Sequence, residues 1–186
     1  MMKRYTKKDF PLEHIRRHLE TGPILLVSSA WKGETNIMTM GWHMMMEFTP
    51  ALFGCIISNQ NHSFGLIRKT GECVVNVPTA ELATTAAGIG NCSGCDVDKF
   101  EKFGLTKAPA AIVQAPLIAE CYANFECRLY DASRIDKYNF FIWEVVKAHV
   151  APAVKRPRTI HYKGEGEFRV AGETINLAKK FRPEYL

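Results

Sequence analysis

The 186-residue sequence lacks an apolar run long enough to cross a membrane. Its longest runs, Pro23–Val27 and Leu52–Ile57, are far shorter than the roughly 20 residues that a membrane helix requires. The N-terminus also lacks the basic region, apolar stretch and small-residue cleavage site of a secretory signal. We therefore expect no membrane partner and a cytoplasmic location, where the six cysteines stay reduced.

The sequence also lacks the common motifs of catalytic and nucleotide-binding sites. Neither G-x-x-x-x-G-K-[ST] nor G-x-G-x-x-G occurs, which argues against a P-loop and a Rossmann domain. His14 and His18 have helical i, i+4 spacing, but no H-E-x-x-H pattern accompanies them, and no Ser-His-Asp arrangement stands out. We expect no catalytic side chain and no metal ligand, so that the chemistry depends on a bound cofactor.

One C-x-x-C pair, Cys92 and Cys95, lies in a Gly-containing segment. No second pair follows at the spacing of a zinc site. Three interpretations of the pair remain open: two ordinary loop cysteines, a redox-active dithiol, or a structural zinc site.

The net charge of +5 is modest, and much of it lies near the N-terminus, where Asp9 and Glu13 interrupt the basic residues. Aromatic residues are not interleaved with these charges as they are in nucleic-acid-binding surfaces. We expect no nucleic-acid partner, although a weak attraction for phosphorylated small molecules fits this charge.

The composition, 47% hydrophobic and 23% charged, is that of a globular protein. No internal repeat or second-domain boundary is visible, so we expect a single domain over residues 1–186. Many strands with few helices favour a mainly β fold, an antiparallel barrel of Greek-key type that is closed or nearly closed. A long excursion, Gly88–Pro116, should cross its surface and contain a short helix near Asp98–Phe103.

The pattern of apolar, β-branched and turn-forming residues predicts the individual elements. A Trp31–Glu34 turn should join the first two strands, and Gly71 should end the second helix. The predicted helices are Pro11–Thr21, Ser63–Thr70 and Thr79–Ala87; the predicted strands are Ile24–Ala30, Asn36–Met44, Leu52–Ser58, Cys73–Val77, Ala119–Asp131, Asn139–Val150, Thr159–Tyr162 and Glu167–Val170, before a polar segment, Leu177–Leu186, that packs on the outside or on a partner.

The most informative segment runs from Asn36 to Ser63, because an apolar strand lies in it between two polar clusters. After the strand, a turn rich in Asn, Gln and Ser opens a helix. The N-H groups and the dipole at the start of a helix attract anions. The segment therefore predicts a site for a flat, phosphorylated ligand.

These motifs together resemble the flavin reductase-like family of FMN-binding split barrels. The resemblance covers about Pro23–Val150 and rests on several motifs in the same order: Asn36–Trp42, the strand after Pro50, the Ser/Asn/His turn, Gly71–Pro78, and Ser93–Gly94 with Asp96–Phe100. Flavoredoxin and NADH:FMN oxidoreductase-like proteins have the most similar patterns.

The resemblance implies a homodimer that holds FMN in a groove near the subunit interface. By position, one group of residues should contact the flavin ring and ribityl chain, a second the phosphate and lower ribityl oxygens, and a third should approach from the excursion. The first group is Thr39, Met40, Gly41, Trp42 and His43, the second Ser58, Asn59, His62 and Ser63, and the third Ser93 and Lys99. Asn36 is also expected to bind the cofactor.

The family resemblance implies an FMN-dependent oxidoreductase that takes hydride from NADH or NADPH and reduces free flavin, ferric iron or a protein. Two alternatives remain open: an electron carrier of the flavoredoxin type without a nicotinamide site, and a ligand-binding barrel without redox activity. Trp42 and Met44–Met46 also fit a plain core position. Family members often have His and Gly where this chain has Tyr138 and Trp143, so Trp143 could fill space for a second substrate.

Overall fold

We describe the protein from a computed structural model, in which residues 11, 22–176, 178–180 and 182 are described here. The helix predicted over Pro11–Thr21 lies outside these residues except for Pro11, and so does most of the predicted C-terminal segment. Among the described residues, no helix combines the length and the apolar character needed to span a membrane.

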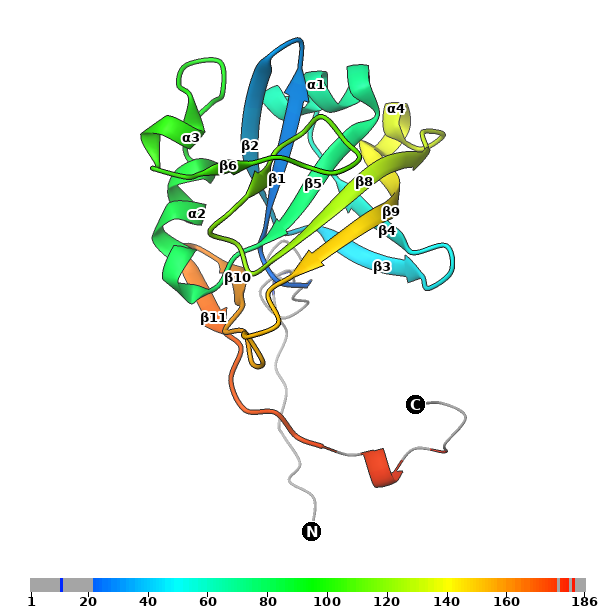
Figure 1. Ribbon diagram of the computed structural model, residues 1–186, viewed down its shortest axis with the longest axis vertical. Helices are drawn as coiled ribbons and strands as arrows, with labels where there is room; N and C mark the ends of the chain where they lie inside the picture. The colour runs from blue at the N-terminus through cyan, green and yellow to red at the C-terminus, as the bar shows by residue number, and fades with distance from the viewer. Residues whose placement is uncertain (1–10, 12–21, 177, 181, 183–186) are drawn as a thin grey trace.

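A seven-stranded antiparallel sheet forms the centre of the molecule (Figure 1). The strands lie in the order β2-β1-β5-β8-β9-β4-β3. Their bounds are β1 Leu25–Trp31, β2 Glu34–Met40, β3 His43–Glu47, β4 Leu52–Ile56, β5 Glu72–Val77, β8 Ala123–Asp131 and β9 Phe140–Val150. This confirms the predicted mainly β, antiparallel architecture.

The two edge strands of this sheet, β2 and β3, are neighbours in the sequence, and only Gly41 and Trp42 separate them. A chain this short can join opposite edges only if the sheet curls until its edges approach each other. No hydrogen-bonded ladder pairs β2 with β3 in the described part of the chain, so the barrel is split and not closed. The single strand predicted over Asn36–Met44 is therefore wrong, because the chain leaves the first edge at Gly41.

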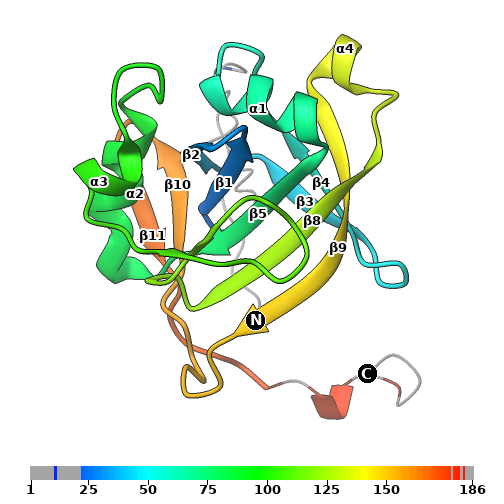
Figure 2. The ribbon, with the colours of Figure 1, turned by 45° about the horizontal axis from the view of Figure 1, so that its top comes forward.

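Short helices and two small hairpins cover the sheet, with α1 near one end and α2 and α3 beside β2 (Figure 1). Figure 2 shows the β10–β11 hairpin next to α2, as Figure 1 does. The helices are α1 His62–Thr70, η2 Ala80–Leu82, α2 Ala83–Gly90, α3 Lys99–Lys102, α4 Ile135–Tyr138 and η3 Ala178–Lys180, and the hairpin strands are β6 Lys107–Ala108 with β7 Leu117–Ile118 and β10 Ile160–Gly164 with β11 Glu167–Val170.

Local turn chemistry explains two of the boundaries. Lys32 and Gly33 both have positive φ, 48° and 85°, as a two-residue hairpin turn requires, and Trp31 pairs with Glu34 across it. Gly71 adopts the left-handed conformation, φ 64°, and its N-H donates to the Ile67 carbonyl, which ends α1. Both predicted turns are confirmed.

The hydrophobic core has three clusters among the described residues: the inside of the curled sheet, the contact of the sheet with α2 and α3, and a smaller contact of the sheet with the end of the excursion. Phe141 and Trp143 stack inside the first of these clusters, with ring centroids 5.6 Å apart. The Trp143 indole N-H donates to Sγ of Cys55 at 3.3 Å. Trp143 therefore fills the core and does not line the pockets described below.

The predicted surface excursion exists, and a buried carboxylate holds its second half against the sheet. Glu126 is fully buried and accepts hydrogen bonds from the N-H groups of Ala111, Ile112 and Val113 and from the His149 ring. Burial alone would raise the pKa of Glu126, but these hydrogen bonds lower it to about 2. The charged carboxylate thus serves as an anchor for the excursion.

Candidate functional site

Two adjoining pockets form one groove along β2. They have volumes of about 650 Å³ and about 410 Å³, and both are lined by Gly90 and Asn91 at the end of α2. The larger pocket is also lined by Ile24, Thr39, Gly41, Trp42, Ala86, Ala87, Tyr162, Lys163, Gly164, Gly166 and Phe168, and the smaller by Asn36, Met38, Gln60, Asn61, His62, Cys92, Ser93, Gly94 and Lys99.

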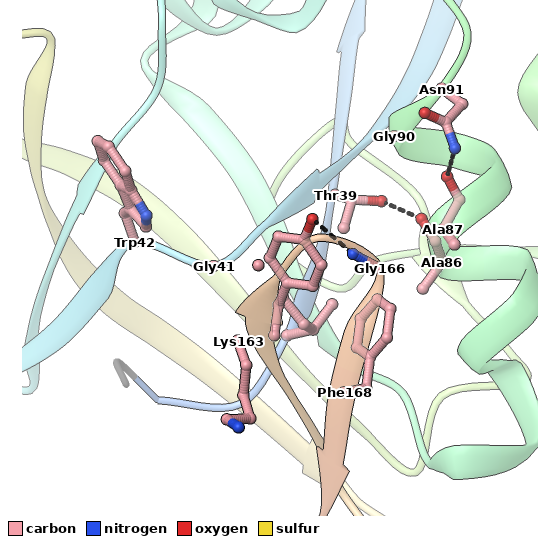
Figure 3. Close-up of a pocket in the computed structure, with 13 residues that line it drawn as sticks. Thr39, Gly41, Trp42, Ala86, Ala87, Gly90, Asn91, Lys163, Gly166 and Phe168 are labelled. Carbon is pink, nitrogen blue, oxygen red and sulfur yellow. Dashed lines mark hydrogen bonds between the residues drawn. The ribbon is translucent and has the colours of Figure 1, made fainter. Parts of the chain in front are cut away.

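The larger pocket lies between the end of β2, α2 and the β10–β11 hairpin. Figure 3 shows Phe168 of the hairpin on the side of Ala86, while Trp42 stands apart on the opposite side. Trp42 is 60% exposed. Thr39 donates from Oγ1 to the Ala86 carbonyl at 2.6 Å, which fixes β2 to α2 (Figure 3). Aromatic rings and small residues therefore dominate this end, which suits a flat ring system.

The smaller pocket contains the groups that favour an anion. Helix α1 begins there, Asn61 makes no side-chain capping hydrogen bond, and the first turn holds no acidic residue. Lys99 reaches the same pocket from α3, is only 5% exposed, and donates from Nζ to the Ile89 carbonyl at 2.9 Å. Burial lowers the pKa of Lys99. An anion beside this ammonium group would compensate for its lost hydration.

Asn36 lies at the base of the smaller pocket with an unsatisfied oxygen. Its Nδ2 donates to Oγ of the fully buried Ser63 at 2.9 Å. Its Oδ1 is buried and has no hydrogen-bond partner, the single such side-chain atom among the described residues. A Cβ atom on Gly94 would lie 2.3 Å from this oxygen, so only glycine fits there without a shift of Asn36. A buried acceptor without a partner in a pocket points to a ligand that donates to it.

His62 lines the smaller pocket, but both ring nitrogens already have partners in the protein. Nε2 contacts Oε1 of Glu34, and Nδ1 lies 3.0 Å from Sγ of Cys95. A phosphate that bonds to the ring would have to displace one of them.

The groove brings together seven of the twelve predicted site residues. The other five lie elsewhere: the Met40 side chain is in the core, His43 donates from Nε2 to the Pro23 carbonyl, and Ser63 is buried behind Asn36. Ser58 and Asn59 are exposed in the turn before α1 without lining either pocket. The seven are Asn36, Thr39, Gly41, Trp42, His62, Ser93 and Lys99.

Sequence reasoning did not assign the β10–β11 hairpin to the site, although it predicted both strands. Tyr162 and Phe168 pair across the hairpin with ring centroids 5.0 Å apart, and the adjacent Gly164 and Gly166 both have positive φ. An aromatic pair beside two glycines was the available indication of a ligand-facing hairpin. Gln60 and Asn61 belong to the Asn/Gln/Ser turn that the sequence indicated for a phosphate, although the family resemblance did not single them out, and they line the pocket where Ser58 and Asn59 do not.

Exposed apolar side chains gather on β3 and the turn after it. Met44, Met45 and Phe48 are 56%, 65% and 90% exposed. The interpretation of Met44–Met46 as core residues is therefore wrong, because β3 is an edge strand whose side chains are exposed.

Comparison with solved structures defines the class of this fold. A flavin reductase-like enzyme domain from Shewanella baltica OS155, described as FMN-binding, is 28% identical and has a TM-score of 0.76, with 90% of this chain and 95% of that chain covered. The flavoredoxin of Desulfovibrio vulgaris (Miyazaki F) shares the fold with a TM-score of 0.78 at 22% identity, over 96% and 97% of the two chains. The fold is thus the split barrel of flavin reductase-like proteins.

The sequence matches support the same assignment. An uncharacterized protein of Archaeoglobus fulgidus is 35% identical over 161 residues, which cover 86% of this chain and 90% of that protein. Residues 16–169 match the flavin reductase like domain. The chain belongs to this family, as its motifs indicated.

Proposed function

We propose that the groove binds FMN and that the protein is an FMN-dependent oxidoreductase. The observation that supports this most strongly is the gradient along the groove: a buried cation and a helix N-terminus at one end, and aromatic rings at the other. FMN has the same division into a charged phosphate and a flat ring. The FMN-binding relative from Shewanella baltica, 28% identical, supports the same cofactor.

The phosphate would lie in the smaller pocket. Lys99 supplies a charge there, and the first N-H groups of α1 supply donors along the helix dipole. The Oδ1 of Asn36 can accept a hydrogen bond from a ribityl hydroxyl, which would satisfy the buried acceptor.

The ring would lie in the larger pocket against Thr39, Gly41 and Phe168. Bound FMN would supply the hydride-transfer chemistry of the proposed reaction. The protein's contribution is then to orient the ring, to cover one face with α2 and the hairpin, and to leave access beside the exposed Trp42.

We further propose that NADH or NADPH is the reductant and that free flavin, ferric iron or a protein accepts the electrons. The test mixes the FMN-loaded protein anaerobically with each nucleotide and follows the visible absorption of the flavin. Rapid bleaching supports the reductase. Persistent colour with both nucleotides, together with bleaching by dithionite, would instead indicate an electron carrier.

We propose a homodimer that covers the exposed side chains of β3. The patch formed by Met44, Met45, Met46 and Phe48 follows directly after Trp42 at the groove. A second copy would shield this patch and lie close to the groove.

All six cysteines are free, which suits the cytoplasmic location that we propose.

A further inference from the structure

A line of three polar side chains lies at the rim of the smaller pocket, and the FMN contacts proposed above do not use their ring or thiol groups. Glu34 begins β2, His62 begins α1, and Cys95 lies in the excursion. His62 contacts Glu34 through Nε2, and its Nδ1 lies 3.0 Å from Sγ of Cys95. Three segments far apart in the sequence thus converge on one imidazole.

The partners of the ring determine where its proton lies. An ionised Glu34 can only accept a hydrogen bond, so Nε2 carries the proton and Nδ1 presents a lone pair to the thiol. His62 can therefore take the proton of Cys95, while Glu34 stabilises the imidazolium that forms. The imidazole lies between its two partners, so the three groups do not converge on one metal ion; no metal-binding group was found among the described residues.

Cys95 differs from the other five cysteines of the chain because it is exposed. Cys92 lies three positions earlier in the C-x-x-C pair and is half-buried, and its Sγ donates to carbonyls of α2 at 3.5 and 3.9 Å. The other four cysteines, Cys55, Cys73, Cys121 and Cys127, are buried. Burial raises the pKa of Cys55 and of Cys121 to about 12, which keeps both unreactive.

We propose that Cys95 and Cys92 form a redox-active dithiol that reduces accessible disulfides, with His62 as general base. Cys95 transfers its proton to His62, and its sulfur attacks one sulfur of the substrate disulfide; a Cys95 mixed disulfide forms, and the first substrate thiolate leaves. The imidazolium returns this proton to the first substrate thiolate. Cys92 then loses its thiol proton to the solvent and attacks Sγ of Cys95, the second substrate thiolate leaves and takes up a proton, and a Cys92–Cys95 disulfide remains. The substrate gains the two electrons that the dithiol loses.

The experiment treats reduced wild-type protein with less than one equivalent of 5,5′-dithiobis(2-nitrobenzoate). The proposal predicts that each reagent molecule releases both of its thionitrobenzoate groups and that the protein loses the mass of two hydrogens. Cys92→Ser should release one group only and retain a mixed disulfide on Cys95. Cys95→Ser should slow the fast reaction by about tenfold or more, and Glu34→Gln should slow it with unchanged stoichiometry.

Two results would overturn the proposal. One is that Cys95 of the wild type, identified by peptide mapping, reacts no faster than free cysteine. The other is that the mixed disulfide on Cys95 persists although Cys92 is present. Both are measured on the wild type, so an unfolded variant does not obscure them. The assay needs no nicotinamide and is run with and without FMN, so its outcome is independent of the proposed reductase function.

Discussion

The Asn36 amide donates from Nδ2 to Oγ of Ser63 at 2.9 Å, and this hydrogen bond leaves Oδ1 against Gly94. Ser63 thus acts on the groove through Asn36 and does not reach it directly. The pair fixes one wall of the smaller pocket, and the close approach of Gly94 depends on the orientation of the amide.

Replacement of Gly94 by alanine tests this relationship. The added Cβ would lie 2.3 Å from Asn36 Oδ1, so Asn36 must move and FMN affinity should fall by about tenfold. Fluorescence titration with FMN measures the change. Gly172→Ala is the matched control, because a Cβ there meets nothing within 4 Å and Gly172 lines neither pocket; equal affinities of both variants would contradict the role of Asn36.

Replacement of Lys99 by methionine tests the phosphate end. Loss of the buried ammonium should weaken FMN binding by about 10- to 100-fold, the range of a charge-assisted hydrogen bond. Riboflavin binding should hardly change, because riboflavin has no phosphate. Lys102→Met removes an equal charge from an exposed position of the same helix and serves as the control. If Lys99→Met weakened both flavins equally, the phosphate would lie elsewhere.

Glu126 predicts a pH dependence of stability. Its folded pKa, about 2, lies below the ordinary 4.5, so its contribution is present above pH 4.5 and is lost as the pH falls toward 2. The shift corresponds to about 3 kcal/mol. In urea unfolding at neutral pH, Glu126→Gln should lower the free energy of unfolding by a comparable amount. The variant should also lose less stability than the wild type as the pH falls from 4.5 toward 2.

The exposed Glu120, which also accepts from a backbone N-H, provides the comparison for Glu126. Glu120→Gln should change the free energy of unfolding by less than about 1 kcal/mol. A loss as large as that of Glu126→Gln would show that burial is not the source of the effect.

The patch on β3 predicts a change of oligomeric state. Met45→Lys places a charge on an apolar surface that we assign to the dimer interface, so light scattering should show a shift from dimer to monomer. Ile112→Lys changes an exposed apolar residue of the excursion and should leave the dimer intact. If light scattering showed that the wild-type protein is a monomer, the assignment of this patch to a dimer interface would be contradicted.

The sequence predicted those features that depend on local chemistry. The Lys32–Gly33 turn and the end of α1 at Gly71 follow from backbone conformations that few residues tolerate. The family resemblance predicted that the second strand, the turn before α1 and the excursion line the groove. Apolar periodicity could not show that the chain crosses from one sheet edge to the other at Gly41, since this depends on pairing between distant strands.

The same limit applies to the site residues. A polar residue in the first turn of a helix can face a ligand or the interior, and the rotation of α1 against β1 and β2 decides that Ser63 faces inward. Likewise, Tyr162 and Phe168 reach the groove only through the packing of a hairpin that is distant in the sequence. Non-local packing, and not residue type, determines whether these side chains face the groove or the interior.

The most direct test of the central claim is the crystal structure of the protein with FMN. We predict the phosphate within hydrogen-bond distance of Lys99 Nζ and the first turn of α1, with the ring between Thr39 and the β10–β11 hairpin. A phosphate at the Trp42 end, or FMN outside this groove, would contradict the account.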